Sequence, residues 1–328
     1  MRHDRSPSRP QQVASAQVSG PADYQLLAIE LFEPAEMTDS QKQSIVRPSI
    51  SYWKDAWRRL RRNPVSMIGL VLVVLVTLTA VFAPLLTPYD YYTQNLARAN
   101  ESPSAEHLFG LDFLGRDILT RVLFGSRISM TVAYVSAAII LVIGVLYGGI
   151  AAYFGGRTDM VMMRIVDIVS GIPSMLYLIL FMVTLGPGVR SIILALGITL
   201  WMGMARMVRS EVLSLRNQEF ALAAQALGIA RTRILVTHLI PNSMGTIIVN
   251  LTFAIPVAIF SESFLSFLGL GVSAPQASWG TLAAEALQSY MVYPHQLVFP
   301  SLAICVTILA FNFLGDGLRD ALDPKMRK

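Results

Sequence analysis

Charged residues are scarce in this chain. Asp, Glu, Lys and Arg make up 14% of its 328 residues, whereas ordinary soluble domains contain about 25%. Hydrophobic residues make up 54%, and the mean hydropathy is +0.54. This composition argues against a soluble globular protein, and the sequence predicts an all-α polytopic membrane protein.

Cysteine and histidine are scarce as well. The single cysteine, Cys305, excludes an intrachain disulfide and a cysteine-based zinc site. The four histidines are scattered along the chain, so we expect no metal site. The G-x-S-x-G, H-E-x-x-H and P-loop patterns are missing too. We therefore expect a chain that is not an enzyme, has no catalytic residues and holds no cofactor of its own.

The net charge of +5 and the pI near 9.4 allow a nucleic-acid partner in principle. No compact basic domain is present to bind one, and basic residues beside apolar runs orient membrane proteins instead. Residues 51–64 place Trp53, Trp57 and Leu60 at helical spacing among basic residues. This pattern predicts an interfacial helix on anionic membrane lipid, the alternative being a solvated linker.

We expect residues 1–50 to form a disordered cytoplasmic tail.

Six apolar runs are long enough to be membrane helices. The first is 65–86, followed by a polar extracytoplasmic segment at 87–127, a membrane core at 128–316 and a cytoplasmic tail at 317–328. The five runs of the core are Ile128–Phe154, Met160–Leu185, Ser191–Ala205 (extending to Val208), Ser243–Phe260 and Leu297–Leu314. Most Lys and Arg residues beside the runs fall on the side of the N-terminus, so both termini are predicted to be cytoplasmic.

The longest polar loop inside the core, 209–242, is predicted to be cytoplasmic. Its segment from Glu219 to Leu227 favours a helix, and Gly228 is expected to cap it with a positive φ. A second helix, Ile229–Ile240, is predicted to end at Pro241. We interpret the small-residue face of the first helix as a surface presented to a soluble partner.

Ionisable residues near the apolar runs are the remaining candidates for function, because an unpaired charge in hydrocarbon is costly. Asp159, Arg164 and Asp167 are interpreted as a structural ion-pair patch, with a direct role in gating as the alternative. Glu262 lies just beyond the fifth run, which Pro256 loosens. Two interpretations stay open for it: the wall of a water-filled translocation path, or the outer headgroup region.

The loop resembles the EAA loop of ABC-importer permeases. Ala223, Ala224 and Gly228 keep the spacing of that motif, and the segment from His238 to Pro241 fits its ending. Leu222 stands where the name-giving Glu is expected, and Glu219, one turn earlier, is the candidate substitute.

The resemblance extends from about residue 53 to the C-terminus and is closest to the C-type subunit of the dipeptide/oligopeptide/nickel group. The matching segments are His107–Gly110, Leu114–Arg121, Gly125–Ser129, Arg164–Asp167, Ile172–Ser174, Ser266–Gly271, Ser278–Gly280 and Asn312–Pro324.

The resemblance implies the type I ABC-importer permease fold in a bacterial cell membrane. It implies a second homologous permease subunit, two cytoplasmic ATPases that bind ATP and Mg, and an extracytoplasmic substrate-binding protein. The implied cargo is a short peptide, with nickel or another small solute as the alternative. An ion-driven secondary transporter is a more remote alternative, since no internal repeat is seen.

Overall fold

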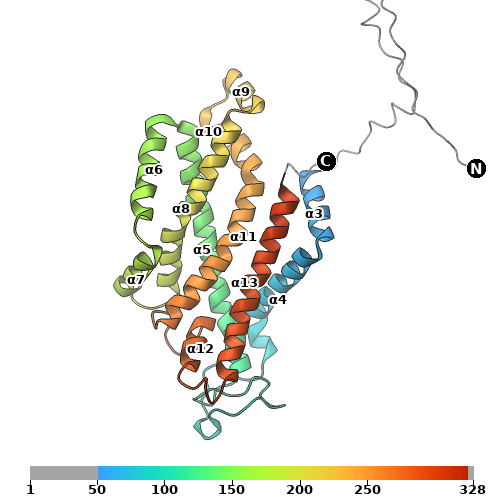
Figure 1. The fold of residues 1–328 in the computed structure, drawn as a ribbon, viewed down its shortest axis with the longest axis vertical. Helices are drawn as coiled ribbons and strands as arrows, with labels where there is room; N and C mark the ends of the chain where they lie inside the picture. The colour runs from blue at the N-terminus through green and yellow to red at the C-terminus, as the bar shows by residue number, and fades with distance from the viewer. Residues whose placement is uncertain (1–50, 324–328) are drawn as a thin grey trace, which may run out of the picture. The chain divides into compact units, whose positions relative to one another are not determined.

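The computed structural model describes residues 51–323, which fold mainly into helices (Figure 1). The predicted tail at 1–50 lies outside the described residues, as do residues 324–328. The helices of eight or more residues are α3 (Tyr52–Arg62), α4 (Pro64–Leu86), α5 (Ile118–Phe154), α6 (Gly156–Ser170), α7 (Ser174–Leu185), α8 (Val189–Arg216), α9 (Glu219–Ala226), α11 (Ile240–Phe267), α12 (Trp279–Ala286) and α13 (His295–Leu322).

The first two helices meet at a sharp, capped junction. The Asn63 side chain accepts hydrogen bonds from the backbone N–H groups of Val65 and Ser66, at 3.1 and 3.3 Å, and thereby starts α4. Along α3, Leu60 is buried whereas Trp53 and Trp57 are exposed. The three residues that sequence spacing placed together are thus divided between the protein core and the surface.

The central helix, α5, starts ten residues before the predicted Ile128. Asp117 caps it, accepting a hydrogen bond from the Thr120 N–H at 2.7 Å. Glycine then allows α5 to lie close against α8, because a Cβ on Gly148 would stand 2.2 Å from the Ala205 carbonyl oxygen. The α5–α8 pair therefore forms the centre of the bundle, with α6 and α7 on one side and α3 and α4 on the other (Figure 1).

The predicted third span, Met160–Leu185, is not one straight helix. It is divided into α6 and α7, which are bent by 78° around Gly171–Pro173. Pro173 offers no N–H and disfavours helical geometry at the residue before it, which explains the break. Five helices in the described part are long and apolar enough to span a membrane, and this bent pair makes six if it counts as one span.

The prediction that a helix ends at Pro241 was wrong. A short helix at Arg231–Ile234 continues through a π-helical turn, Leu235–Leu239, into α11 without a break. At the end of that turn the Ile240 N–H reaches back five residues, to the Leu235 carbonyl. The wider π turn makes room for a proline ring and does not need the missing N–H, so the helix passes through.

Sequence reasoning also missed α12, a short helix between α11 and α13. Ser278 and Thr281 form a capping box at its start. The Trp279 side chain is 2% exposed, and its Nε1–H donates to the Val122 carbonyl of α5 at 2.9 Å. This bond fixes α12 to the central helix.

Candidate functional site

The polar loop predicted from sequence lies at one end of the helical unit. Helix α9 projects beyond the other helices there, at the end opposite the segment 87–117 (Figure 1). It follows directly on α8, whose last turns carry the chain out of the bundle. Movement of α9 is therefore mechanically tied to a central helix.

Gly228 ends α9 in a complete Schellman motif. Its φ is +73°, which is the left-handed region that favours glycine. The Gly228 N–H donates to the Gln225 carbonyl at 3.0 Å, and the Ile229 N–H donates to the Ala224 carbonyl at 3.2 Å. These are the two bonds that define the motif, so the geometry of the loop is set by backbone hydrogen bonds.

Two alanines of α9 face inward, which corrects in part the interpretation of the small-residue face as the presented surface. Ala221 and Ala224 are 0% and 6% exposed and join a buried cluster with Val212, Ile234 and Leu235. Small side chains allow α9 to approach the rest of the loop closely. Their role visible in the structure is internal packing.

The outward face of α9 is apolar with an acidic start. Phe220, Leu222 and Leu227 are 41%, 51% and 79% exposed. Glu219 and Ala223 are exposed beside them. An exposed cluster of large apolar side chains on a polar loop is typical of a protein interaction site. The sequence signal was available, since Phe220, Leu222 and Leu227 are the large apolar residues of an otherwise alanine-rich segment.

The two other predicted loop residues lie on the neighbouring helical segment. His238 is half-buried within the π turn, and Pro241 is exposed in the first turn of α11. The Asn242 side chain donates to the His238 carbonyl at 2.6 Å. These residues shape the return of the chain into the bundle.

A cavity of about 520 Å³ lies between the end of α5 and this loop. Tyr153, Gln225 and Gly228 line it, together with the basic residues Arg216 and Arg231. The Arg216 guanidinium donates to the Ala152 carbonyl at the C-terminus of α5, at 2.9 Å. A cation at this position complements the helix dipole and joins the end of α8 to the end of α5.

The acidic residues of α6 form ion pairs, but with different partners from those predicted. Asp159 accepts two hydrogen bonds from Arg209 of α8, at 2.5 and 2.6 Å. Asp167 accepts one from Arg206 of the same helix at 3.1 Å. Arg164, the third residue of the predicted patch, makes no ion pair among the residues the structure describes. The patch thus holds α6 against α8.

Glu262 is fully buried. Its carboxylate accepts hydrogen bonds from the hydroxyls of Ser129 at 3.0 Å, Ser266 at 2.8 Å and Ser263 at 3.4 Å. Ser129 belongs to α5 and also accepts from the Trp279 N–H at 3.3 Å. Glu262 therefore joins α5, α11 and α12 from inside the protein and is not open to a path in this structure.

A second polar network, not foreseen from sequence, fixes the opposite end of the unit. Arg116 and Arg121, 5% and 3% exposed, pair with Asp112 and with Glu285 of α12. The two arginines balance the two carboxylates, as buried charges require. This network attaches the segment before α5 to α12.

At the surface of that segment, Arg98 donates to both Glu101 and Glu106. These hydrogen bonds hold the pKa of each carboxyl below its ordinary value of 4.5.

In the part of the chain that the structure describes, no group of three or more His, Cys, Asp or Glu residues could hold a metal ion.

Comparison with known proteins identifies related membrane proteins. A family model described as binding-protein-dependent transport system inner membrane component matches residues 141–328. A second, the N-terminal TM domain of oligopeptide transport permease C, matches residues 51–103.

Two relatives come from Bacillus subtilis (strain 168). The oligopeptide transport system permease protein OppC is 51% identical over 298 residues, covering 91% of this chain and 98% of the relative. The dipeptide transport system permease protein DppC is 47% identical over 309 residues, covering 94% and 97%.

The fold resembles a chain of the MetNI methionine ABC transporter, with a TM-score of 0.53 and 17% identity, over 63% of this chain and 96% of that one. At this identity the likeness concerns the fold alone.

Proposed function

The chain belongs to the family of binding-protein-dependent transport system inner membrane components, and on this premise we propose that it is the C-type permease subunit of an ATP-driven importer of short peptides. The observation that carries the proposal is the identity of 51% and 47%, over nearly the whole chain, to permeases of oligopeptide and dipeptide transport systems. The chain is a multi-pass membrane protein whose relatives are transport permeases.

A permease of this family works with partners. We propose that this chain pairs with a second homologous permease subunit to form the translocation path. Two cytoplasmic ATPases, which bind the ATP and Mg, supply the driving force, and an extracytoplasmic binding protein delivers the cargo. The α9 end then faces the cytoplasm with both termini, and the segment 87–127 faces outward. The distribution of basic residues supports this orientation.

Coupling is assigned to the α9 loop. The exposed side chains of Phe220, Leu222 and Leu227 provide the apolar contact with an ATPase, and Glu219 provides an acidic group beside it. The Schellman motif at Gly228 keeps this face in one orientation. A fixed orientation is needed because a flexible loop absorbs the displacement that ATP binding produces.

The role of Glu262 in the path is proposed to be indirect. Because its carboxylate is enclosed by serine hydroxyls, it acts by holding α12 against α5 and α11. A change in α12 alters the outer part of the path, so Glu262 affects transport through position and not through contact with cargo.

The test is uptake by proteoliposomes that contain the complete importer, with binding protein outside and ATP inside. Labelled trialanine is expected to accumulate with ATP and not with a non-hydrolysable analogue. Accumulation of ⁶³Ni²⁺ in place of the peptide favours the small-solute alternative. Uptake that needs no ATP and stops when an ionophore removes the ion gradient refutes the importer and favours the secondary transporter.

A further inference from the structure

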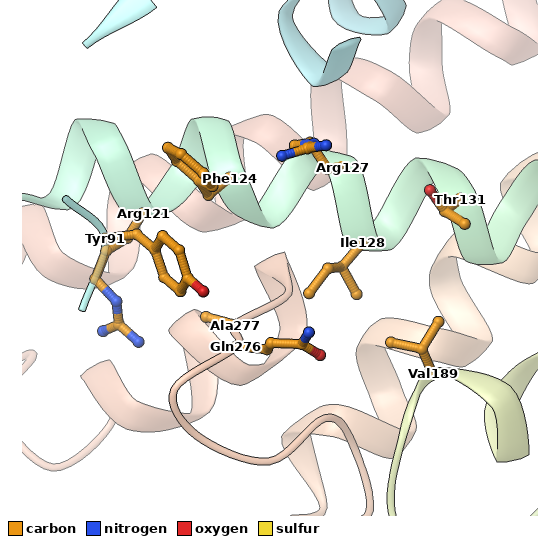
Figure 2. A pocket seen from close by; sticks show the side chains of 9 residues that line it. All are labelled: Tyr91, Arg121, Phe124, Arg127, Ile128, Thr131, Val189, Gln276 and Ala277. Atoms are coloured by element: carbon orange, nitrogen blue, oxygen red, sulfur yellow. The ribbon is translucent and has the colours of Figure 1, made fainter. Parts of the chain in front are cut away.

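A cavity of about 330 Å³ opens at the end of the unit opposite α9. One wall comes from successive turns of α5, and the other comes from the residues before α12 and the first residue of α8 (Figure 2). Figure 2 shows Phe124, Arg127, Ile128 and Thr131 along α5, with Gln276, Ala277 and Val189 across from them. Three elements of the membrane core thus meet at this cavity.

The cavity carries one positive charge that the described residues do not compensate. Arg121 and Arg127 line it, and no acidic residue does. The Arg121 charge is balanced, since its Nη1 lies 2.7 Å from Asp112 and 2.6 Å from Glu285. Arg127 is exposed and has no ion pair or hydrogen bond among the described residues. Its guanidinium lies 6.0 Å from the centre of the Phe124 ring, which leaves its donors available.

The other lining groups suit an amide next to an apolar side chain. Gln276 offers an amide and Thr131 a hydroxyl. The stacked rings of Tyr91 and Phe124, with centroids 4.7 Å apart, supply an apolar wall. The cavity lining therefore offers an amide and a hydroxyl to a peptide bond, and an aromatic surface to the side chain beside it.

We propose that this cavity receives the C-terminal carboxylate of the peptide cargo, with Arg127 as its ion-pair partner. The inference rests on the proposed function. Ligand pockets measure about 300–1,000 Å³, so 330 Å³ accommodates the last one or two residues and not a whole oligopeptide. Every linear peptide ends in a carboxylate, whatever its side chains. Recognition of this group by a planar guanidinium therefore suits a permease that passes many sequences.

The experiment compares trialanine with trialanine amide in proteoliposomes that contain the complete importer, at saturating binding protein. The ratio of the two uptake rates is measured for the wild type and for Arg127→Gln. Dividing one ratio by the other cancels any preference of the binding protein. Loss of one hydrogen bond to a charged group corresponds to about tenfold, so we expect the free-acid preference to fall about tenfold in Arg127→Gln. Arg127→Lys keeps the charge and is expected to fall less.

Arg190→Gln is the matched control. Arg190 is exposed in the first turn of α8 and does not line the cavity. It is expected to leave the ratio unchanged. Two results overturn the inference. One is an unchanged ratio in Arg127→Gln, including an equal loss of both peptides, which indicates docking of the binding protein. The other is the same shift of the ratio in Arg190→Gln. If the wild type takes up neither peptide, the proposed function itself fails.

Discussion

Replacing Gly228 by valine is expected to uncouple ATP hydrolysis from uptake while leaving the protein inserted in the membrane. A Cβ at this position meets no atom within 4 Å, so steric overlap with neighbours does not contribute. The cost arises from the backbone, because φ is +73° and left-handed geometry costs an L-residue about 1–2 kcal/mol. Such a cost lowers the population of the capped loop by about 5–30-fold.

Two further variants separate backbone conformation from side-chain bulk. Gly228→Asn also adds a side chain, but asparagine tolerates the left-handed region better than valine does. This variant is therefore expected to keep most of the coupling. Gly203→Val adds the same valine to α8, at a glycine that has open space and no positive φ. It is expected to be nearly neutral. Membrane abundance by immunoblot, binding-protein-stimulated ATPase activity and trialanine uptake are measured for each variant.

The expected result is a fall in uptake per ATP hydrolysed in Gly228→Val, with abundance unchanged. Equal coupling in Gly228→Val and the wild type refutes the reasoning. An equal loss of coupling in Gly228→Asn also refutes it, because the size of the added side chain, and not the backbone φ, then explains the effect.

Three further predictions concern stability in detergent. Glu262→Leu leaves several buried serine hydroxyls without an acceptor, at about 1–3 kcal/mol each, so its Tm is expected below that of Glu262→Gln; equal values contradict the network. Arg98 holds the pKa of Glu101 below 4.5, so this pair contributes fully above that pH and is lost as the pH falls further. The acid-induced fall in Tm should then be smaller in Arg98→Gln, and an unchanged fall argues against the pair. A double-mutant cycle of Arg209→Ala with Asp159→Ala should give a coupling energy of about 0.5–1 kcal/mol, since the pair is partly exposed; additive effects would exclude it.

The presence of the membrane helices follows from sequence because the signal of an apolar run is local, whereas several helix ends, such as the start of α5, do not. An uninterrupted apolar run must form a helix in hydrocarbon, whatever its neighbours, so Pro64–Leu86 was found within one residue of its predicted bounds. The local sequence did not distinguish a proline that breaks a helix from one that a helix accommodates. Pro173 lies at a sharp bend, whereas Pro241 lies within a continuous helix. The π turn that accommodates Pro241 depends on packing of the loop, which no local pattern records.

The candidate site was predictable in part for the same reason. The positive φ of Gly228 follows from its position after a helix-forming run, and the structure has it. The direction in which α9 faces does not follow from the sequence, because it depends on which side of the helix packs against the buried cluster around Ile234. The ion-pair partners of Asp159 were missed because Arg209 is 50 residues away in sequence. Spacing rules apply within one helix and give no information about pairs between helices.

Three arginines of α8 determine how a displacement of α9 is transmitted to the other helices. Arg206 and Arg209 attach α8 to α6, and Arg216 attaches it to the end of α5. A displacement of α9 by a docked ATPase is thus shared by α8, α6 and α5 and not absorbed at the junction. To shift a two-state permease from 1:99 to 99:1, the ATPases must prefer one state by about 5.5 kcal/mol. The two ion pairs to α6 are exposed or partly exposed and contribute only about 0.2–1 kcal/mol each. The transmission therefore depends on the close α5–α8 packing at Gly148 and on the fixed cap at Gly228 more than on any single arginine.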